Sequence, residues 1–555
     1  MERLAADAMV ESLAAHGLDR LFCVPGESYL TLLDALVRDG RVQVVACRHE
    51  GGAGFMAVGD AKVTGKPGVV AVSRGPGATN ASIAVHLAEQ DAVPLLVLIG
   101  QVARFERGRG AFQEVDYGQM FGGIAKGVWE VSDGVRLSET IARALQVAQS
   151  GTPGPVVVAL PEDMLADRAG EGTGVPPLPV PHVAPSADEI DRVTALLARA
   201  ERPLLIAGGA LSHPEGRAAL AAAAKAHQLP VALTFKHQEI FDNASPLYAG
   251  YLGFKIAKPV VEAMAEADLI LAVGTRLGDT PTQGYVLPKA PVPDQPLVHV
   301  YPDPAALGRV FRTDVALPAD PTATLHALAA RDGAVSAARH AWVSRLNAQA
   351  RAFGAESYTA PSHGDGLDFG VMVRALAERA PRDSIVASDA GNFSSWVHRL
   401  WPWDGTQIAL GAVGGAMGLG LPGAIAACLR YPEKKVFAFL GDGGAMMTGA
   451  ELATARAVGA KPIVVISNNR SYGTIRLHQE RDYPHRTAGT DLMNPDFAAW
   501  GASFGALGLS VSTAEEAARA ADAALAHDGP VVIEVESSLE AISAYTTITT
   551  LRAGR

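Results

Sequence analysis

The apolar residues of this chain gather in short continuous runs, separated by longer mixed segments rich in Ala, Leu and Glu. Runs without polar alternation predict strands buried on both faces, as in parallel sheets, and the segments between them predict helices. The runs expected to be strands are RLFCVPG, VQVVAC, GVVAVS, PLLVLIG and GPVVVALP, then PLLIAGG, PVALTF, LILAVG and LVHVYP, then SIVASD, KKVFAFL, PIVVIS and PVVIEVE. The alternation of strands and helices predicts an α/β protein with doubly wound parallel sheets.

Two connecting segments divide these elements into three blocks. The segment GVPPLPVPHVAPS is too rich in proline for a packed helix or strand, so it predicts a linker. A polar, Ala-rich segment at about 336–365 predicts a second connector. The sequence therefore predicts three parallel-sheet domains over residues 1–170, 186–335 and 365–545.

The composition limits which binding partners and which cellular compartment we expect for this chain. The chain has 555 residues, of which 48% are hydrophobic and 19% charged, as in ordinary globular enzymes. The net charge of −11 argues against a nucleic acid as partner, and the longest apolar runs are too short to span a membrane. The segment MERLAADAMVESLAAHG has no apolar core, so we expect no signal peptide. Cys23, Cys47 and Cys428 lack metal-ligand spacing and predict buried reduced thiols in a cytoplasmic protein.

The segment from 441 to 469, GDGGAMMTGAELATARAVGAKPIVVISNN, holds the most specific pattern. Its Gly-Asp-Gly turn directly follows one predicted strand, and its Asn-Asn pair directly follows another. Between Gly443 and Asn468 lie 24 residues, which predict a helix that ends near Gly459. Because this unit is a right-handed parallel crossover, both polar turns lie at the carboxyl ends of their strands, where open α/β sheets bind ligands.

The residue types in these turns suit a magnesium ion and a diphosphate. Asp442 offers a carboxylate, Asn469 an amide oxygen and Ser471 a backbone carbonyl, and Mg²⁺ prefers such oxygen ligands. The N–H groups of the following helix would offset the charge of a diphosphate. The glycines that would let the backbone approach it are Gly441, Gly443 and Gly444. A Gly-rich turn of an unrelated α/β protein is the alternative reading.

This GDGx24NN pattern resembles the diphosphate and magnesium signature of thiamine-diphosphate-dependent enzymes. The resemblance is to the acetolactate synthase-like branch and covers nearly the whole chain. It implies an N-terminal pyrimidine-binding domain, a central domain and a C-terminal diphosphate-binding domain. It also implies thiamine diphosphate and Mg²⁺ as cofactors.

The segment RHEGGAGFMA is similar to the RHE-x-x-A segment of the same family. The resemblance implies that Glu50 contacts the aminopyrimidine ring and activates the cofactor. In an unrelated chain such a Glu would be a solvated charge at a helix N-terminus. Glu50 and Asp442 lie in different blocks, and in the family the cofactor lies between the first domain of one subunit and the third domain of another. We therefore expect a homodimer or homotetramer with active sites at the subunit interface.

The segment GAVGGAMGLGLPGAIAA contains a formal GxGxxG match. It follows no strong apolar strand and lacks the later acidic residue of a dinucleotide site, so that reading is weak. The resemblance implies instead that Met417 supports the bent cofactor and that the carbonyl of Gly415 accepts a hydrogen bond from its amino group. It also implies that Asn392 holds the diphosphate, and Gly473 completes the expected cofactor-binding set.

Three further segments resemble the substrate side of the family's site. VPGESYLTLLDAL places Glu27 in the loop after the first strand, and SRGPGATN matches the synthase segment SGPGATN with Arg74 in place of a small residue. AFQEVD matches the synthase AFQE, which implies that Gln113 faces the reacting carbon. His478 occupies the position of the Trp that selects the second 2-oxo acid. Glu27 is either a pocket acid or base or a solvated loop residue, and His478 is either a pocket residue or an exposed histidine.

Other positions depart from the family. Ile475 stands where pyruvate decarboxylases keep a Glu, which argues against simple decarboxylation to an aldehyde. The central segment GTRLGDTPTQGY differs from the flavin-binding pattern, with Thr280 in place of its second Arg. Losing that guanidinium removes a planar bidentate partner for a phosphate, so we do not expect FAD in the central domain.

Together these residues predict an acetolactate synthase-like enzyme that depends on thiamine diphosphate and Mg²⁺. It would decarboxylate a 2-oxo acid, form a carbanion/enamine at C2 of the cofactor and transfer that fragment to an acceptor carbonyl. A 2-hydroxyacyl-CoA lyase or an oxalyl-CoA decarboxylase, acting on an acyl-CoA, is the alternative enzyme. A flavin oxidase and a catalytically inactive binding paralogue are further alternatives, and the intact Glu50, Asp442 and Asn469 speak against the paralogue.

Overall fold

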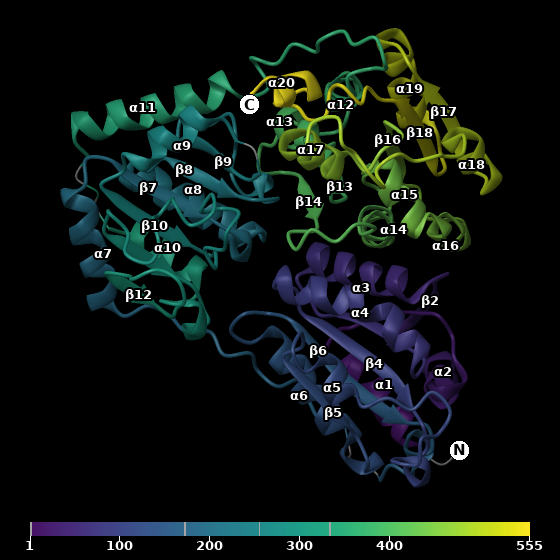
Figure 1. Ribbon diagram of the computed structural model, residues 1–555. Coiled ribbons are helices and arrows are strands. Elements are labelled where there is room, and N and C mark those ends of the chain that lie inside the picture. Colours follow the sequence, from purple (N-terminus) through teal and green to yellow (C-terminus); the bar gives the residue numbers. More distant parts are fainter. Residues whose placement is uncertain (1–2, 171–173, 255, 332, 334, 555) are drawn as a thin grey trace.

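The computed structural model describes residues 3–170, 174–254, 256–331, 333 and 335–554. Within these ranges the chain forms three six-stranded sheets, each parallel throughout and covered by helices on both faces (Figure 1). In Figure 1 the N-terminal domain lies below the C-terminal domain, and the central domain lies to the left. The prediction of three doubly wound parallel-sheet domains is confirmed, and the boundaries chosen for them stay predictions.

The N-terminal sheet has the strand order β2-β1-β3-β4-β6-β5. Its strands are β1 (Arg20–Cys23), β2 (Gln43–Ala46), β3 (Gly68–Val72), β4 (Leu95–Gln101), β5 (Gly127–Glu130) and β6 (Pro155–Pro161). Its helices are α1 (Ala5–Ala15), α2 (Leu30–Asp39), α3 (Glu50–Thr64), α4 (Pro76–Gln90), α5 (Tyr117–Phe121) and α6 (Leu137–Gln149). The inner strands β3, β4 and β6 are buried at every residue, because helices cover both faces of the sheet.

The C-terminal sheet repeats this order as β14-β13-β15-β16-β18-β17. Its strands are β13 (Ile385–Ser388), β14 (Ile408–Gly411), β15 (Val436–Gly441), β16 (Ile463–Asn468), β17 (Leu507–Val511) and β18 (Val531–Glu536). Its helices are α12 (Phe369–Ala377), α13 (Ser394–Leu400), α14 (Gly420–Arg430), α15 (Asp442–Thr448), α16 (Leu452–Val458), α17 (Gly473–Asp482), α18 (Phe497–Ser503), α19 (Ala514–Ala526) and α20 (Ile548–Ala553). Because the two sheets share one topology, α3 and α14 occupy equivalent positions, each after the second strand of its sheet.

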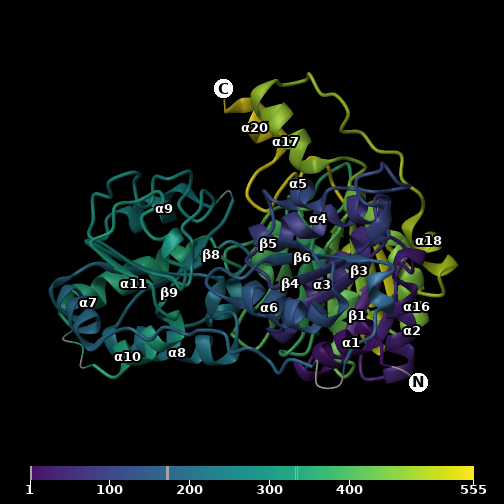
Figure 2. The same cartoon turned by 90° about the horizontal axis from the view of Figure 1, so that it is seen from below.

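These equivalent helices pack against each other across the N-terminal and C-terminal domains. Their backbones approach closely, since a Cβ atom added at Gly59 would lie 2.7 Å from the Cα of Gly423. At the end of α14, Arg430 donates to both carboxylate oxygens of Asp60, at 2.6 and 2.8 Å. One cluster of buried residues continues from α3 into α14, so the two domains share a core. Figure 2 shows these two domains stacked, with the central domain beside them.

The central sheet has the strand order β12-β11-β10-β7-β8-β9. Its strands are β7 (Pro203–Ala207), β8 (Val231–Thr234), β9 (Tyr248–Leu252), β10 (Leu269–Val273), β11 (Leu297–Val300) and β12 (Val315–Leu317). Its helices are α7 (Ala187–Arg199), α8 (Pro214–His227), α9 (Lys258–Ala265), α10 (Pro321–Ala329) and α11 (Ala337–Ala352). Counted within the domain from β9, this is the 3-2-1-4-5-6 order of dinucleotide-binding folds, but the order alone assigns no ligand.

The strands that the hydrophobic pattern did not predict all lie at sheet edges: β5, β9, β12, β14 and β17. An edge strand has a partner on one side only and is often short, so its apolar run is brief or interrupted. In β5, for example, no residue is fully buried.

The prediction of a single helix between Gly443 and Asn468 is wrong. The segment forms α15, then a 3₁₀ turn (Gly449–Glu451), then α16, which ends at Gly459 as expected. At the break, a Cβ atom added at Gly449 would lie 2.5 Å from the ring of Trp500. The turn also directs the side chain of Glu451 toward the N-terminal domain, where it accepts hydrogen bonds.

Two further expectations concern the cysteines and membrane-spanning helices. Cys23, Cys47 and Cys428 are buried free thiols, as expected. Among the helices in the described ranges, none has the length and apolar character needed to cross a bilayer.

Candidate functional site

The three residues predicted to bind a metal lie together at the carboxyl ends of β15 and β16, which are neighbouring strands. The carboxylate Oδ2 of Asp442 accepts a hydrogen bond from the backbone N–H of Ser471 at 3.1 Å. The amide Oδ1 of Asn469 accepts from the same N–H, also at 3.1 Å. The structure therefore brings Asp442, Asn469 and Ser471 into one cluster.

Asn494, which the sequence did not reveal, completes this cluster. Its Nδ2 lies 2.9 Å from Oδ2 of Asp442 and 2.9 Å from Oδ1 of Asn468. Asn468 itself donates to Glu534 of β18 at 2.6 Å. The first Asn of the Asn-Asn pair is thus held within the sheet, whereas the second lies beside Asp442 and Ser471. Nothing in the 441–469 pattern points to Asn494, because it lies in the loop between α17 and α18.

The electrostatics of Asp442 favour a nearby cation. Only 2% of this residue is exposed, and burial raises the pKa of its carboxyl to about 6 although four hydrogen bonds oppose the effect. The hydroxyl of Ser471 is buried beside it without a hydrogen-bond partner among the described residues. A carboxylate, an amide oxygen and a backbone carbonyl form the oxygen-only donor set that Mg²⁺ prefers. The residues present therefore fit the expected metal.

The glycines at the start of α15 have close protein neighbours. A Cβ atom added at Gly443 would lie 2.4 Å from the ring of Tyr472, and one at Gly444 would lie 2.3 Å from Oδ2 of Asp389. At Gly441 it would lie 3.1 Å from the ring of Phe393. Larger residues would displace these side chains at the helix N-terminus, where a diphosphate is expected.

The segment before α14 lies beside the same helix start. Gly415 and Gly418 have φ angles of 74° and 98°, which residues with a side chain rarely adopt. The N–H of Gly418 donates to both carboxylate oxygens of Asp389, at 2.8 and 2.9 Å. Cε of Met417 lies 3.9 Å from the Cβ position of Gly444. The structure therefore brings Met417, with Gly415 two residues away, next to the glycines of α15.

Asn392 and Gly473 also meet at this edge of the sheet. Nδ2 of Asn392 donates to the carbonyl of Gly473 at 3.2 Å, and its backbone N–H donates to Oγ1 of Thr474 at 3.1 Å. Both contacts lie at the start of α17. His478 and Ile475 follow along this helix, and both are exposed in the single chain.

Glu50 begins α3 at the carboxyl edge of the N-terminal sheet. Its Oε2 accepts a hydrogen bond from Nδ2 of Asn80 at 2.9 Å, and its Oε1 lies 3.4 Å from the Cβ position of Gly77. Both neighbours belong to α4. Within the described ranges, no hydrogen bond or ion pair joins Glu50 to Asp442 of the same chain.

The contact with the C-terminal domain is made instead by the residues just before Glu50. The backbone N–H groups of Arg48 and His49 donate to Oε1 of Glu451, at 3.2 and 3.0 Å. Glu451 is buried, and burial raises the pKa of its carboxyl. The sequence did not reveal that Glu451 joins the two domains. This contact depends on how residues far apart in the sequence pack together.

Glu27 and Gln113 lie in loops that Arg74 connects. Nη2 of Arg74 lies 3.4 Å from Oε1 of Glu27, and its Nε donates to the carbonyl of Phe112 at 3.3 Å. Gln113, the next residue, has a φ of 64°. The structure thus brings the predicted substrate-side residues of the N-terminal domain together, at the same sheet edge as Glu50.

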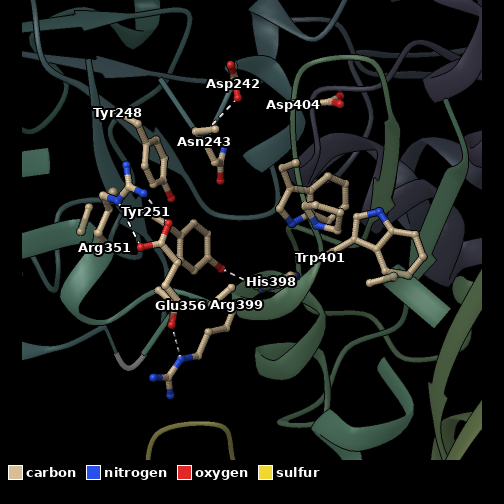
Figure 3. Close-up of a pocket in the computed structure, with 18 of the residues that line it drawn as sticks. Asp242, Asn243, Tyr248, Tyr251, Arg351, Glu356, His398, Arg399, Trp401 and Asp404 are labelled. Atoms are coloured by element: carbon tan, nitrogen blue, oxygen red, sulfur yellow. Dashed lines mark hydrogen bonds and ion pairs between the residues drawn. The ribbon is translucent and has the colours of Figure 1, made fainter. Parts of the chain in front are cut away.

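A cavity of about 520 Å³ lies elsewhere, between the central and C-terminal domains. Figure 3 shows its walls, with Tyr248 and Tyr251 on one side and Trp401 on the other. The hydroxyl of Tyr251 lies 3.0 Å from Nδ1 of His398, and burial lowers the pKa of this histidine to about 3, so its ring is neutral. The described residues that line this cavity include none of those predicted for the cofactor or the substrate.

Family models match all three domains. Residues 3–120 match the thiamine pyrophosphate enzyme N-terminal TPP binding domain, and residues 389–535 match the C-terminal TPP binding domain. Residues 190–328 match the thiamine pyrophosphate enzyme central domain.

Relatives with assigned names are similar over nearly the full length of the chain. The acetolactate synthase large subunit of Parasynechococcus marenigrum is 33% identical over 96% of this chain and 87% of that protein. The acetolactate synthase isozyme 2 large subunit of Escherichia coli is 32% identical over 96% of this chain and 95% of that protein. The mitochondrial acetolactate synthase catalytic subunit of Saccharomyces cerevisiae is 31% identical, covering 95% and 79% of the two chains.

Proposed function

The chain belongs to the thiamine pyrophosphate enzymes and is of the acetolactate synthase type, and we propose that it decarboxylates a 2-oxo acid and joins the remaining fragment to an acceptor carbonyl. The observation that carries this proposal is the cluster of Asp442, Asn469 and Ser471 at the start of α15. The CoA-dependent lyases are not favoured, since the relatives described above are acetolactate synthases.

The C-terminal domain would hold the metal and the diphosphate. Asp442, Asn469 and the carbonyl of Ser471 would bind Mg²⁺ together with diphosphate oxygens, beside the N–H groups at the start of α15. The bound thiamine diphosphate supplies the reactive carbon at which a 2-oxo acid loses carbon dioxide. The remaining contacts expected from this domain are those of Met417, Gly415, Asn392 and Gly473.

The N-terminal domain would supply the proton transfer. Glu50 would hold and exchange a proton at the pyrimidine ring nitrogen, with Asn80 orienting its carboxylate. Because Glu50 lies in the N-terminal domain and Asp442 in the C-terminal domain, and no hydrogen bond links their side chains within the described ranges, we propose that a second copy completes the site. Three large apolar side chains, Phe112, Met446 and Met447, are 74%, 52% and 51% exposed, which suits a surface that another copy covers. Glu27, Gln113 and His478 would then border the substrate.

Removal of the Asp442 carboxylate tests the metal and cofactor assignment. Titration calorimetry of Mg²⁺ with thiamine diphosphate into the protein should show binding to the wild type and none to Asp442→Ala, because the only anionic ligand is lost. Asp528→Ala is the matched control, since this exposed carboxylate pairs with Lys461 at 2.6 Å at the opposite edge of the same sheet. It should bind as the wild type does. Equal affinity in Asp442→Ala would refute the assignment.

A further inference from the structure

Arg74 connects the loops that follow four neighbouring strands of the N-terminal sheet. These strands, β1, β3, β4 and β6, lie side by side in this order. Arg74 follows β3, and its guanidinium reaches Glu27 after β1, the carbonyl of Phe112 after β4 and Glu162 after β6. The carboxyl edge of a parallel sheet is where open α/β folds bind their ligands. Arg74 therefore links these loops at an edge of the sheet where ligands can bind.

The Arg74 cluster carries an excess of negative charge. Nη1 of Arg74 pairs with Oε2 of Glu162 at 2.8 Å, whereas Nη2 makes a longer contact of 3.4 Å with Glu27. The side chain of Arg74 is 10% exposed, that of Glu162 is 37% exposed and that of Glu27 is 72% exposed. One guanidinium thus pairs with two carboxylates. Glu27 makes the longer contact and is also the more exposed of the two.

A short segment joins this cluster to Glu50. Arg74 stands near its start, and Asn80, which donates to the carboxylate of Glu50, stands six positions later. The backbone N–H of Arg74 also donates to Oγ of Ser28 at 3.4 Å, which holds the Glu27 loop against the same segment. Glu27 and Glu50 are therefore attached to one element at one edge of the sheet.

We propose that Arg74 positions Glu27 at the acceptor side of the site, and that the negative charge there selects an uncharged carbonyl compound over a second 2-oxo acid as the acceptor. This inference rests on the proposed function, in which Glu50 serves the cofactor and the donor is a 2-oxo acid. A second 2-oxo acid carries a carboxylate that Glu27 repels, and a second copy covering the site would reduce the screening of this repulsion by water. An aldehyde or ketone without a charge avoids this repulsion.

The reaction on such an acceptor balances without an oxidant. The bond between the carboxylate and the carbonyl carbon of the donor breaks, and carbon dioxide leaves. A bond forms between that carbonyl carbon and the carbonyl carbon of the acceptor. One proton from solvent ends on the acceptor oxygen, and the product is a 2-hydroxyketone. Its new hydroxyl is a hydrogen-bond donor that suits the exposed carboxylate of Glu27.

Acceptor preference is the quantity that tests this inference. The holoenzyme would receive a donor from which it releases carbon dioxide, chosen among pyruvate, 2-oxopentanoate and phenylglyoxylate. The acceptor would be propanal or 2-oxobutanoate. The ratio of kcat/KM for propanal to that for 2-oxobutanoate should favour propanal in the wild type. Glu27→Gln should lower this ratio by about tenfold, equivalent to about 1.4 kcal/mol. Arg74→Gln should also lower this ratio, because Glu27 then loses the guanidinium that positions it.

A change in the ratio of the two kcat/KM values separates a positioning role from a merely structural one. Loss of stability alone would lower both kcat/KM values together and leave their ratio unchanged. Arg74→Lys keeps the positive charge and should restore most of the wild-type ratio. Asp39→Asn is the matched control, since Asp39 pairs with Arg41 at 2.6 Å just before β2, at the opposite edge of the sheet. It should leave the ratio unchanged.

Three results would overturn the inference, and they differ in what they say of the proposed function. A wild type that prefers 2-oxobutanoate, or a ratio unchanged in Glu27→Gln, would refute the selection of an uncharged acceptor while carbon dioxide release still supports the proposed function. If the wild type releases carbon dioxide from none of the three donors, the proposed function fails, and the inference fails with it.

Discussion

Replacing Lys236 by Met should stabilise the protein at neutral pH. Lys236 follows β8 in the central domain and is buried, and its Nζ donates to the carbonyls of Ser388 and Asp389 at the end of β13, at 3.3 and 3.1 Å. Within the described ranges this amine forms no ion pair. Burial lowers the pKa of Lys236 to about 8 from its ordinary value of 10.5.

The sign of the effect follows from comparing the folded and unfolded chains. The folded protein holds the proton of Lys236 less tightly, so the charged amine reduces the free energy of unfolding below about pH 8. This cost disappears as the pH rises from about 8 to about 10.5. At about 1.4 kcal/mol per pH unit, the lowered pKa corresponds to roughly 3 kcal/mol. Methionine avoids this cost but leaves two carbonyls without this donor, which costs about 1–2 kcal/mol. The expected net gain at pH 7 is therefore about 1–2 kcal/mol.

Denaturant unfolding followed by tryptophan fluorescence, at pH 7 and again at pH 9.5, would measure this difference. The advantage of Lys236→Met should shrink at the higher pH, because the wild-type amine is then largely neutral. Lys66→Met is the matched control, since Lys66 is exposed and donates to the carbonyl of Gly17 at 3.2 Å. A Lys236→Met variant that is less stable than the wild type at pH 7 would show that the two hydrogen bonds outweigh the burial of charge.

Three further predictions address the site and its surroundings. Glu50→Gln should still bind thiamine diphosphate but lower turnover by about 10²–10⁴-fold, because the proton-transferring carboxyl is lost; wild-type hydrogen–deuterium exchange at the cofactor C2 would contradict this. Gly59→Ala should destabilise by about 1–3 kcal/mol despite its better helix propensity, because its Cβ would meet the Cα of Gly423 at 2.7 Å; an unchanged Tm would contradict this. The purified protein should be colourless, since by resemblance Thr280 stands where the flavin-binding pattern has its second Arg, and Arg276 donates to the carbonyls of Glu89 and Gln90 in the N-terminal domain; a stoichiometric flavin absorbance band would contradict this.

The sequence predicted the inner strands of each sheet better than the edges, for a physical reason. An inner strand such as β16 is buried at every residue, so its apolar run is continuous and easily found. The edge strand β17 contains Gly508 and Ser510 and is fully buried only at Val511, so its pattern resembles that of a loop. The prediction of one helix over this segment failed as well, and at the break after α15 Gly449 packs against Trp500, which is distant in sequence.

The candidate site was predictable only where one short segment carries its residues. Asp442, Asn469 and Ser471 follow two consecutive strands, so their meeting is a consequence of the crossover between those strands. Asn494, Glu451 and Glu162 left no such signal. Glu162, for example, reaches Arg74 only because β3 and β6 lie on the two sides of β4 in the sheet, and no spacing rule in the sequence encodes that neighbourhood.

The shared topology of the two outer sheets explains how one fold can serve both ends of a cofactor. The loop after the third strand carries Asp442 in the C-terminal domain and Arg74 in the N-terminal domain, so equivalent positions hold opposite charges. The loop after the second strand carries Met417 in one domain and Glu50 in the other. A carboxylate suits a metal-bound diphosphate, and a guanidinium suits the task of fixing two carboxylates beside a substrate. Because equivalent loops differ in charge, two domains of the same topology can contact different parts of one ligand.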